Sequence, residues 1–207
     1  MMNIIAKKIN CFLFGILLLL LVVPVVAQVN HAPANSQLKS FNNALTQVNM
    51  AFTFPEGFKE IKAPNTDDLP FHYGMELPGQ EFEIWLRVNT QKEDEKFLAD
   101  KNVRNTGPDS LYLSLAHDQI TSFTTDNTYL KRKLPDYILD RYNADAGSTF
   151  LLNVDDSPIT KHYKYALLIV LQKNRVGTVL AICFTNEKGP EFFKNMNLAS
   201  SCLKFKD

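Results

Sequence analysis

The 207-residue chain is 45% apolar and 21% charged, and its 22 basic residues balance its 22 acidic ones. This is the composition of an ordinary globular protein, and the eight glycines and ten prolines exclude collagen-like and low-complexity chains. Because phosphate binding requires Lys and Arg concentrated on one surface, a net charge of zero with no long basic block argues against a nucleic-acid partner.

The N-terminal region has the pattern of a secretory signal. Lys7 and Lys8 precede an uninterrupted apolar run over residues 11–23, and Ala27 suits the position before a cleavage site. We therefore expect residues 1–27 to be a signal peptide and the protein to be periplasmic or extracellular, with membrane contact only before cleavage. An uncleaved membrane anchor is the alternative, because the apolar region is just long enough to span a bilayer.

Two cysteines remain after such a cleavage. Cys183 and Cys202 form an even pair in an exported chain, which favours a disulfide bond between them. The alternative is a pair of buried free thiols, because Cys183 lies within an apolar strand pattern and a free cysteine packs as a small apolar residue.

Residues 28–49 are expected to be an N-terminal segment with a short amphipathic helix, and residues 50–207 a single domain. Helical spacing supports the helix, with apolar residues at Leu38, Phe41 and Leu45. A short strand is expected to follow directly at residues 50–54.

The clearest hairpin pattern covers residues 71–77 and 80–90, joined by the turn dipeptide Pro78-Gly79. Apolar and polar residues alternate in both arms, which predicts one buried side and one side at least partly exposed to water. A polar stretch over residues 91–108 comes next, and its role is left open.

Two helices are predicted in the middle of the chain. One is capped by Asp109 or Ser110 and has an apolar stripe, and the other runs from Leu134 or Pro135 to about Tyr142. Between them, Lys131-Arg132-Lys133 is interpreted as a solvated entrance to the second helix.

Strands are then expected at residues 148–154, 163–173 and 176–185, and a last helix after Gly189-Pro190. The last two strands are apolar on both sides, so helices must cover both faces of the sheet. The sequence therefore predicts an α+β protein, a three-layer α/β/α sandwich around a mainly antiparallel sheet. A β-barrel with helices outside is the second choice.

The segment Phe52-Thr53-Phe54-Pro55-Glu56-Gly57-Phe58, with the order of elements that follows it, resembles the PsbP/Mog1-like α/β/α sandwich superfamily. The chain also resembles exported bacterial proteins of the Bacteroidetes type. The first resemblance implies a binding or assembly module rather than an enzyme, by analogy of fold.

The polar side of the hairpin is the predicted binding surface. With a two-residue turn, Gly74 would lie opposite Glu83 and leave a dent beside a carboxylate and an aromatic ring. We therefore expect a ligand or partner side chain to bind at His72, Glu83, Trp85 and Arg87.

No residue is predicted to be catalytic, to bind a cofactor or to bind a metal. The four histidines lack a metal-binding spacing, and the sequence has no nucleophile elbow, phosphate loop or dinucleotide fingerprint. The sequence thus predicts an exported, non-enzymatic module that binds an envelope protein or a small molecule. An envelope hydrolase whose catalytic residues come from distant segments is the alternative.

Overall fold

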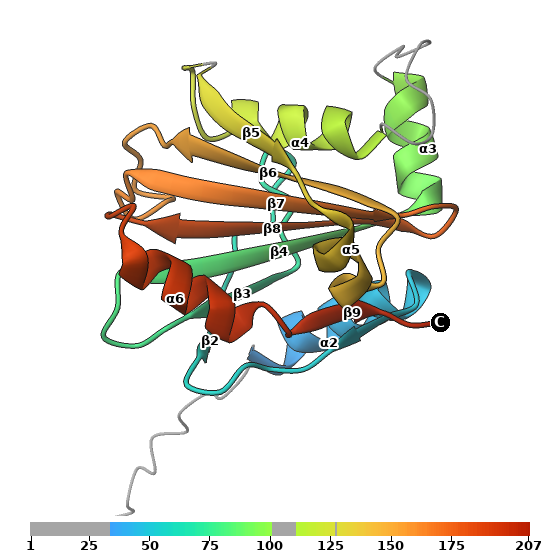
Figure 1. The fold of residues 1–207 in the computed structure, drawn as a ribbon, viewed down its shortest axis with the longest axis horizontal. Coiled ribbons are helices and arrows are strands. Elements are labelled where there is room, and N and C mark those ends of the chain that lie inside the picture. Colours follow the sequence, from blue (N-terminus) through green and yellow to red (C-terminus); the bar gives the residue numbers. More distant parts are fainter. Residues whose placement is uncertain (1–33, 101–110, 127) are drawn as a thin grey trace, which may run out of the picture. The chain divides into compact units, whose positions relative to one another are not determined.

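The computed structural model describes residues 34–100, 111–126 and 128–207, which belong to one compact unit (Figure 1). The predicted signal peptide and part of the polar stretch over residues 91–108 lie outside the described residues.

Helices and a mostly antiparallel sheet make up this unit, so the predicted α+β class is confirmed. In chain order the elements are α2 (Ala34–Gln47), β1 (Met50–Phe52), β2 (Lys59–Ile61), β3 (Tyr73–Glu76), β4 (Phe82–Thr90), α3 (Gln91–Asp100), α4 (Leu111–Thr121), β5 (Tyr129–Lys133), α5 (Asp136–Tyr142), β6 (Ala146–Asn153), β7 (Tyr165–Lys173), β8 (Gly177–Thr185), α6 (Pro190–Ala199) and β9 (Leu203–Phe205).

The main sheet has seven strands in the order β2-β3-β4-β8-β7-β6-β5, and all neighbours are antiparallel. The early hairpin β3–β4 meets the late hairpin β7–β8 where β4 pairs with β8, from Phe82 opposite Thr185 to Thr90 opposite Gly177. A separate two-stranded sheet joins β1 to β9 near the two ends of the unit.

Alternate side chains of the central strands belong to two different buried apolar clusters. Ile84 and Leu86 belong to one cluster, whereas Trp85 belongs to the other. Because successive side chains of a strand point to opposite faces, the sheet is buried on both sides. Residues of α2, α5, α6, β1 and β9 complete the first cluster, and α4 contributes to the second. Figure 1 shows α5 and α6 in front of the strands, whereas α4 lies behind β5.

The β3–β4 hairpin has a different register from the predicted one. The Gln80 amide donates to the Leu77 carbonyl at 3.0 Å, and Gly79 has φ +79°, as a type II turn requires. Such a turn does not match the twist of paired strands, so the connection between the strands is longer than two residues. It is closed by the hydrogen bond that the Leu77 amide donates to the Phe82 carbonyl at 3.1 Å. Gly74 consequently pairs with Trp85 rather than with Glu83.

Four elements were not predicted as they occur: β2, α3, β5 and β9. Lys131-Arg132-Lys133 belongs to the edge strand β5 and is no helix entrance, because an exposed edge tolerates consecutive charges that discourage further pairing. The helix α3 begins in the stretch that was read only as polar, and it has few apolar residues to mark a buried face. The strand β2 has only three residues, too few to show a period.

Gly177 is closely packed at the end of the pairing of β4 with β8. A Cβ atom built there would lie 2.4 Å from the Asn89 carbonyl oxygen and 2.7 Å from a methyl of Val48. Asn89 belongs to β4, and Val48, in the connection between α2 and β1, is fully buried, so neither has room to move aside.

We predict that Gly177→Ala lowers the free energy of unfolding by about 3 kcal/mol, because it adds a backbone clash to an unfavourable φ. Gly79→Ala is the matched control: its φ is also positive, but nothing lies within 4 Å of the added Cβ, and its cost should be about 1 kcal/mol. Urea denaturation of both variants measures the difference. Equal losses would contradict the packing explanation.

Candidate functional site

The centre of the predicted partly exposed side of the β3–β4 hairpin is buried. Trp85 is only 2% exposed, and its ring lies 4.5 Å from that of Phe184, 5.5 Å from Phe71 and 6.2 Å from Phe123, centroid to centroid. Phe123 lies two residues after α4, and Phe71 precedes β3. Segments distant in sequence therefore cover this face around Trp85, whereas His72 and Arg87 are half-buried, so the face is exposed to water only in part.

The dent expected at Gly74 is also filled. A Cβ atom on this glycine would lie 3.0 Å from the Ile61 carbonyl oxygen and 3.1 Å from the Ala63 amide nitrogen. The small residue serves the close approach of β2 to β3, because it leaves room for a neighbouring backbone.

Glu83 lies beside Trp85 and is 2% exposed. The indole nitrogen of Trp85 donates to one carboxylate oxygen at 3.3 Å, and the ammonium of Lys161 forms an ion pair with the other. Lys161 and His162 both have positive φ, of 52° and 61°. A buried carboxylate requires a partner, so this loop conformation brings a cation to Glu83.

Arg87 and His72 lie in a polar cluster on the same side of the sheet. The Arg87 Nε donates to the Asn89 side-chain oxygen at 2.8 Å, and a terminal guanidinium nitrogen donates to Gln119 Oε1 at 3.0 Å. The His72 Nδ1 accepts a hydrogen bond from the backbone amide of Val88, with the two nitrogens 3.1 Å apart, and burial lowers the pKa of His72. This imidazole therefore acts as a neutral acceptor that holds β4.

Asp94 on α3 belongs to the same polar cluster. It is 3% exposed, and Thr178 Oγ1 donates to its Oδ2 at 3.0 Å. Burial raises the pKa of Asp94 to about 6, although hydrogen bonds from Thr178 and Asn89 oppose the rise. The four predicted site residues thus fall into two groups, and each group is already bound to protein atoms. Ligand binding by them stays a prediction.

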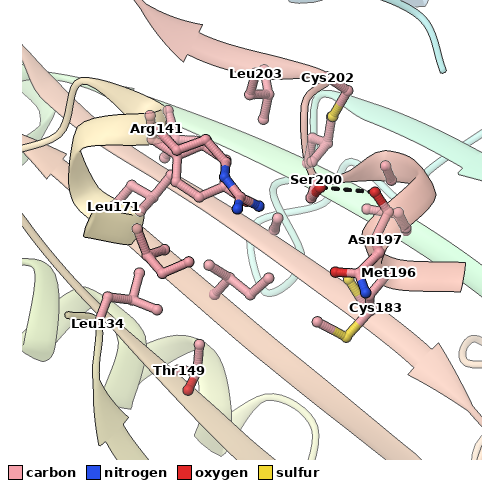
Figure 2. Close-up of a pocket in the computed structure, with 18 residues that line it drawn as sticks. Leu134, Arg141, Thr149, Leu171, Cys183, Met196, Asn197, Ser200, Cys202 and Leu203 are labelled. Atoms are coloured by element: carbon pink, nitrogen blue, oxygen red, sulfur yellow. Dashed lines mark hydrogen bonds between the residues drawn. The ribbon is translucent and has the colours of Figure 1, made fainter. Parts of the chain in front are cut away.

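A cavity lies on the opposite face of the sheet. Its volume is about 190 Å³, and α5, α6, β9 and four strands surround it (Figure 2). The described residues that line it are mostly apolar: Ile84, Leu86, Leu134, Ile138, Arg141, Tyr142, Thr149, Ile169, Leu171, Val179, Ala181, Cys183, Met196, Asn197, Ala199, Ser200, Cys202 and Leu203.

The strand register explains where this hollow forms. Ala181 pairs with Leu86 on β4 and with Ile169 on β7, and Ile169 pairs with Thr149 on β6. One row of side chains therefore crosses the sheet, with its smallest member between two large ones. The methyl group of Ala181 leaves space that a longer side chain would fill.

Both helices beside the cavity are fixed by specific contacts. Asn143 ends α5 in a left-handed conformation, and its side-chain amide donates to the Phe205 carbonyl of β9 at 3.2 Å. Pro190 begins α6, and Phe192 packs on Phe82 with ring centroids 5.8 Å apart. These contacts hold α5 and α6 apart over the sheet, so the space between them is part of the fold.

Cys183 and Cys202 are free, buried thiols that line this cavity, so the structure shows the second of the two alternatives raised from the sequence. They lie apart in Figure 2. Burial raises the pKa of both thiols, that of Cys202 to about 12. A thiol that stays protonated is a poor nucleophile.

Sequence reasoning missed the cavity because its walls come from α5, α6 and four strands that are far apart along the chain. One signal was present: Ala181 is a small residue inside the apolar strand pattern at residues 176–185. Arg141, at the end of α5, had no feature that set it apart.

Comparisons with known proteins add no further assignment. No protein-family model matches the chain, and no curated protein matches it significantly. Among residues 34–100, 111–126 and 128–207, no helix combines the length and apolar character needed to cross a bilayer. The same residues contain no group of three or more His, Cys, Asp or Glu side chains placed to hold a metal ion.

We predict that the Asp94→Asn variant loses part of the pH dependence of stability. The carboxyl has a pKa of 3.8 when unfolded and about 6 when folded, so the folded state binds more protons between these values. The free energy of unfolding of the natural protein should therefore rise by about 2 kcal/mol relative to the variant as pH falls from about 7 to about 4.

Chemical denaturation of both proteins across this pH range provides the measurement. The difference between them isolates Asp94, because every other group titrates in both. A constant difference would show that Asp94 is not the source.

Proposed function

We propose that the protein is a binding module that takes a small, mainly apolar ligand into the cavity between α5, α6 and the sheet. The observation that supports this most is a hollow of about 190 Å³ lined almost entirely by apolar side chains. An apolar cavity of about 150 Å³ in another protein is large enough for benzene. Transfer of a ligand's apolar surface from water into such a space is favourable.

The chemistry of the lining favours binding over catalysis. No His, Asp or Glu occurs among the described residues that line the cavity. Its two thiols remain protonated at neutral pH, because burial raises the pKa of each. A hydrolase would need an activated nucleophile and a base beside the substrate, so we favour the binding module over the hydrolase alternative.

We also propose the fold and the location that the sequence predicts. The order of elements and the burial of both sheet faces support a three-layer α/β/α sandwich of the PsbP/Mog1-like kind. The pattern of residues 1–27 supports export to the periplasm or the exterior. Binding on the α5–α6 face replaces the hairpin surface as the proposed site, because Trp85 and Glu83 are covered.

Methionine-methyl NMR with hexanol as the probe tests the cavity directly. Met196 lines the cavity, whereas Met50 and Met75 do not. We predict that hexanol shifts the Met196 methyl resonance in a saturable manner and shifts those of Met50 and Met75 much less. A seven-heavy-atom ligand should bind with a dissociation constant of about 1 mM.

Ala181→Leu should abolish this shift, because the added side chain occupies the hollow at the centre of the row. Ala99→Leu is the matched control, since Ala99 is exposed on α3. Thr149→Leu provides a second cavity-filling variant if the first does not fold. An unchanged Met196 resonance in the folded natural protein would refute the proposed function.

A further inference from the structure

Arg141 is the one charged side chain among the described residues that line the cavity. It lies in the last turn of α5, and Figure 2 shows its guanidinium extending from α5 toward α6, which carries Asn197. The rest of the lining is apolar or neutral, so the cavity has an apolar interior and a cationic group at its side.

The guanidinium belongs to an exposed side chain and has no partner among the described residues of α6. Within the described part of the chain, Arg141 forms no side-chain hydrogen bond and no ion pair. The nearby Ser200 hydroxyl donates to the Asn197 carbonyl at 2.8 Å and is thus occupied. No described residue bonds to the side-chain amide of Asn197, which leaves a second donor near the guanidinium.

We propose that the ligand of this cavity is an amphipathic carboxylate, whose anionic group binds Arg141 and whose short apolar tail lies on the row around Ala181. This inference rests on the proposed function and adds the class of ligand to it. The planar guanidinium presents parallel N–H donors that match the two oxygens of a carboxylate. One guanidinium balances one negative charge, which favours a monocarboxylate over a phosphate.

The apolar part of the lining sets the form of the tail. Ile169 and Leu171 on β7 and Val179 on β8 contribute aliphatic side chains to the cavity wall. Because none of the described lining residues is acidic, an anion entering beside Arg141 meets no repelling carboxylate in the cavity wall. A straight aliphatic tail with a terminal carboxylate satisfies both ends of the site.

A purely structural role for Arg141 is the competing explanation. A cation in the last turn of a helix interacts favourably with the helix dipole, and Arg141 occupies such a position in α5. That role would affect the stability of the ligand-free protein and would not distinguish between ligands. Ligand selectivity is therefore the readout that separates the two.

The test compares hexanoate with hexanol at neutral pH, using the Met196 methyl resonance to measure each dissociation constant. The two probes share an aliphatic tail and differ in the charge of the head group. In the natural protein hexanoate should bind about tenfold more tightly than hexanol. Arg141→Gln should remove this advantage and leave hexanol binding unchanged.

Two further variants serve as controls. Arg141→Lys keeps the charge and should retain part of the preference for hexanoate. Arg132→Gln removes one charge from the exposed strand β5 and should change neither affinity. Thermal denaturation without ligand shows whether each variant is folded.

Each outcome has a definite meaning. Equal affinities for the two probes in the natural protein, or an equal loss of both in Arg141→Gln, would overturn the proposed ligand class while the cavity remained a binding site. If neither probe shifts Met196, the proposed function fails together with this inference. Loss of the hexanoate preference in Arg132→Gln would show a long-range charge effect and would also overturn it.

Discussion

The pairing of β4 with β8 is the constraint on which the rest of the fold depends. It connects the early hairpin to the late one along nine residue pairs, from Phe82 to Thr90 on β4. Strands on either side add outward from this pair. Gly177 permits the close approach of β4 and β8 at one end of the pair, where the Cβ atom of any larger residue would clash with the Asn89 carbonyl.

The same pairing decides which side chains face which cluster. Because residues alternate along β4, fixing Ile84 on one face places Trp85 on the other. The Trp85 side is closed by aromatic rings and by the ion pair of buried Glu83 with exposed Lys161. The Ile84 side is closed less completely, because Ala181 is small and two helices bound the space above it. The binding site that we propose therefore lies on the Ile84 side of the sheet and not on the Trp85 side.

Much of the fold follows from local patterns, whereas the candidate site does not. The strands at residues 163–173 and 176–185 and the start of the last helix at Gly189-Pro190 were predicted from the sequence, because apolar runs and turn chemistry are local. The burial of Trp85 could not be predicted, because an alternating strand has the same sequence pattern whether water or Phe123 covers its polar side. The cavity depends on the positions of α5 and α6 on the sheet, and these positions cannot be predicted from the sequence of any single segment.

The two outer strands of the main sheet, β2 and β5, have a consequence for self-association. An unpaired strand offers free amides and carbonyls to another molecule and can seed polymers. Here β2 is only three residues long, and β5 carries Lys131-Arg132-Lys133. A second copy that paired with β5 would bring like charges together, which disfavours association through this edge of the sheet.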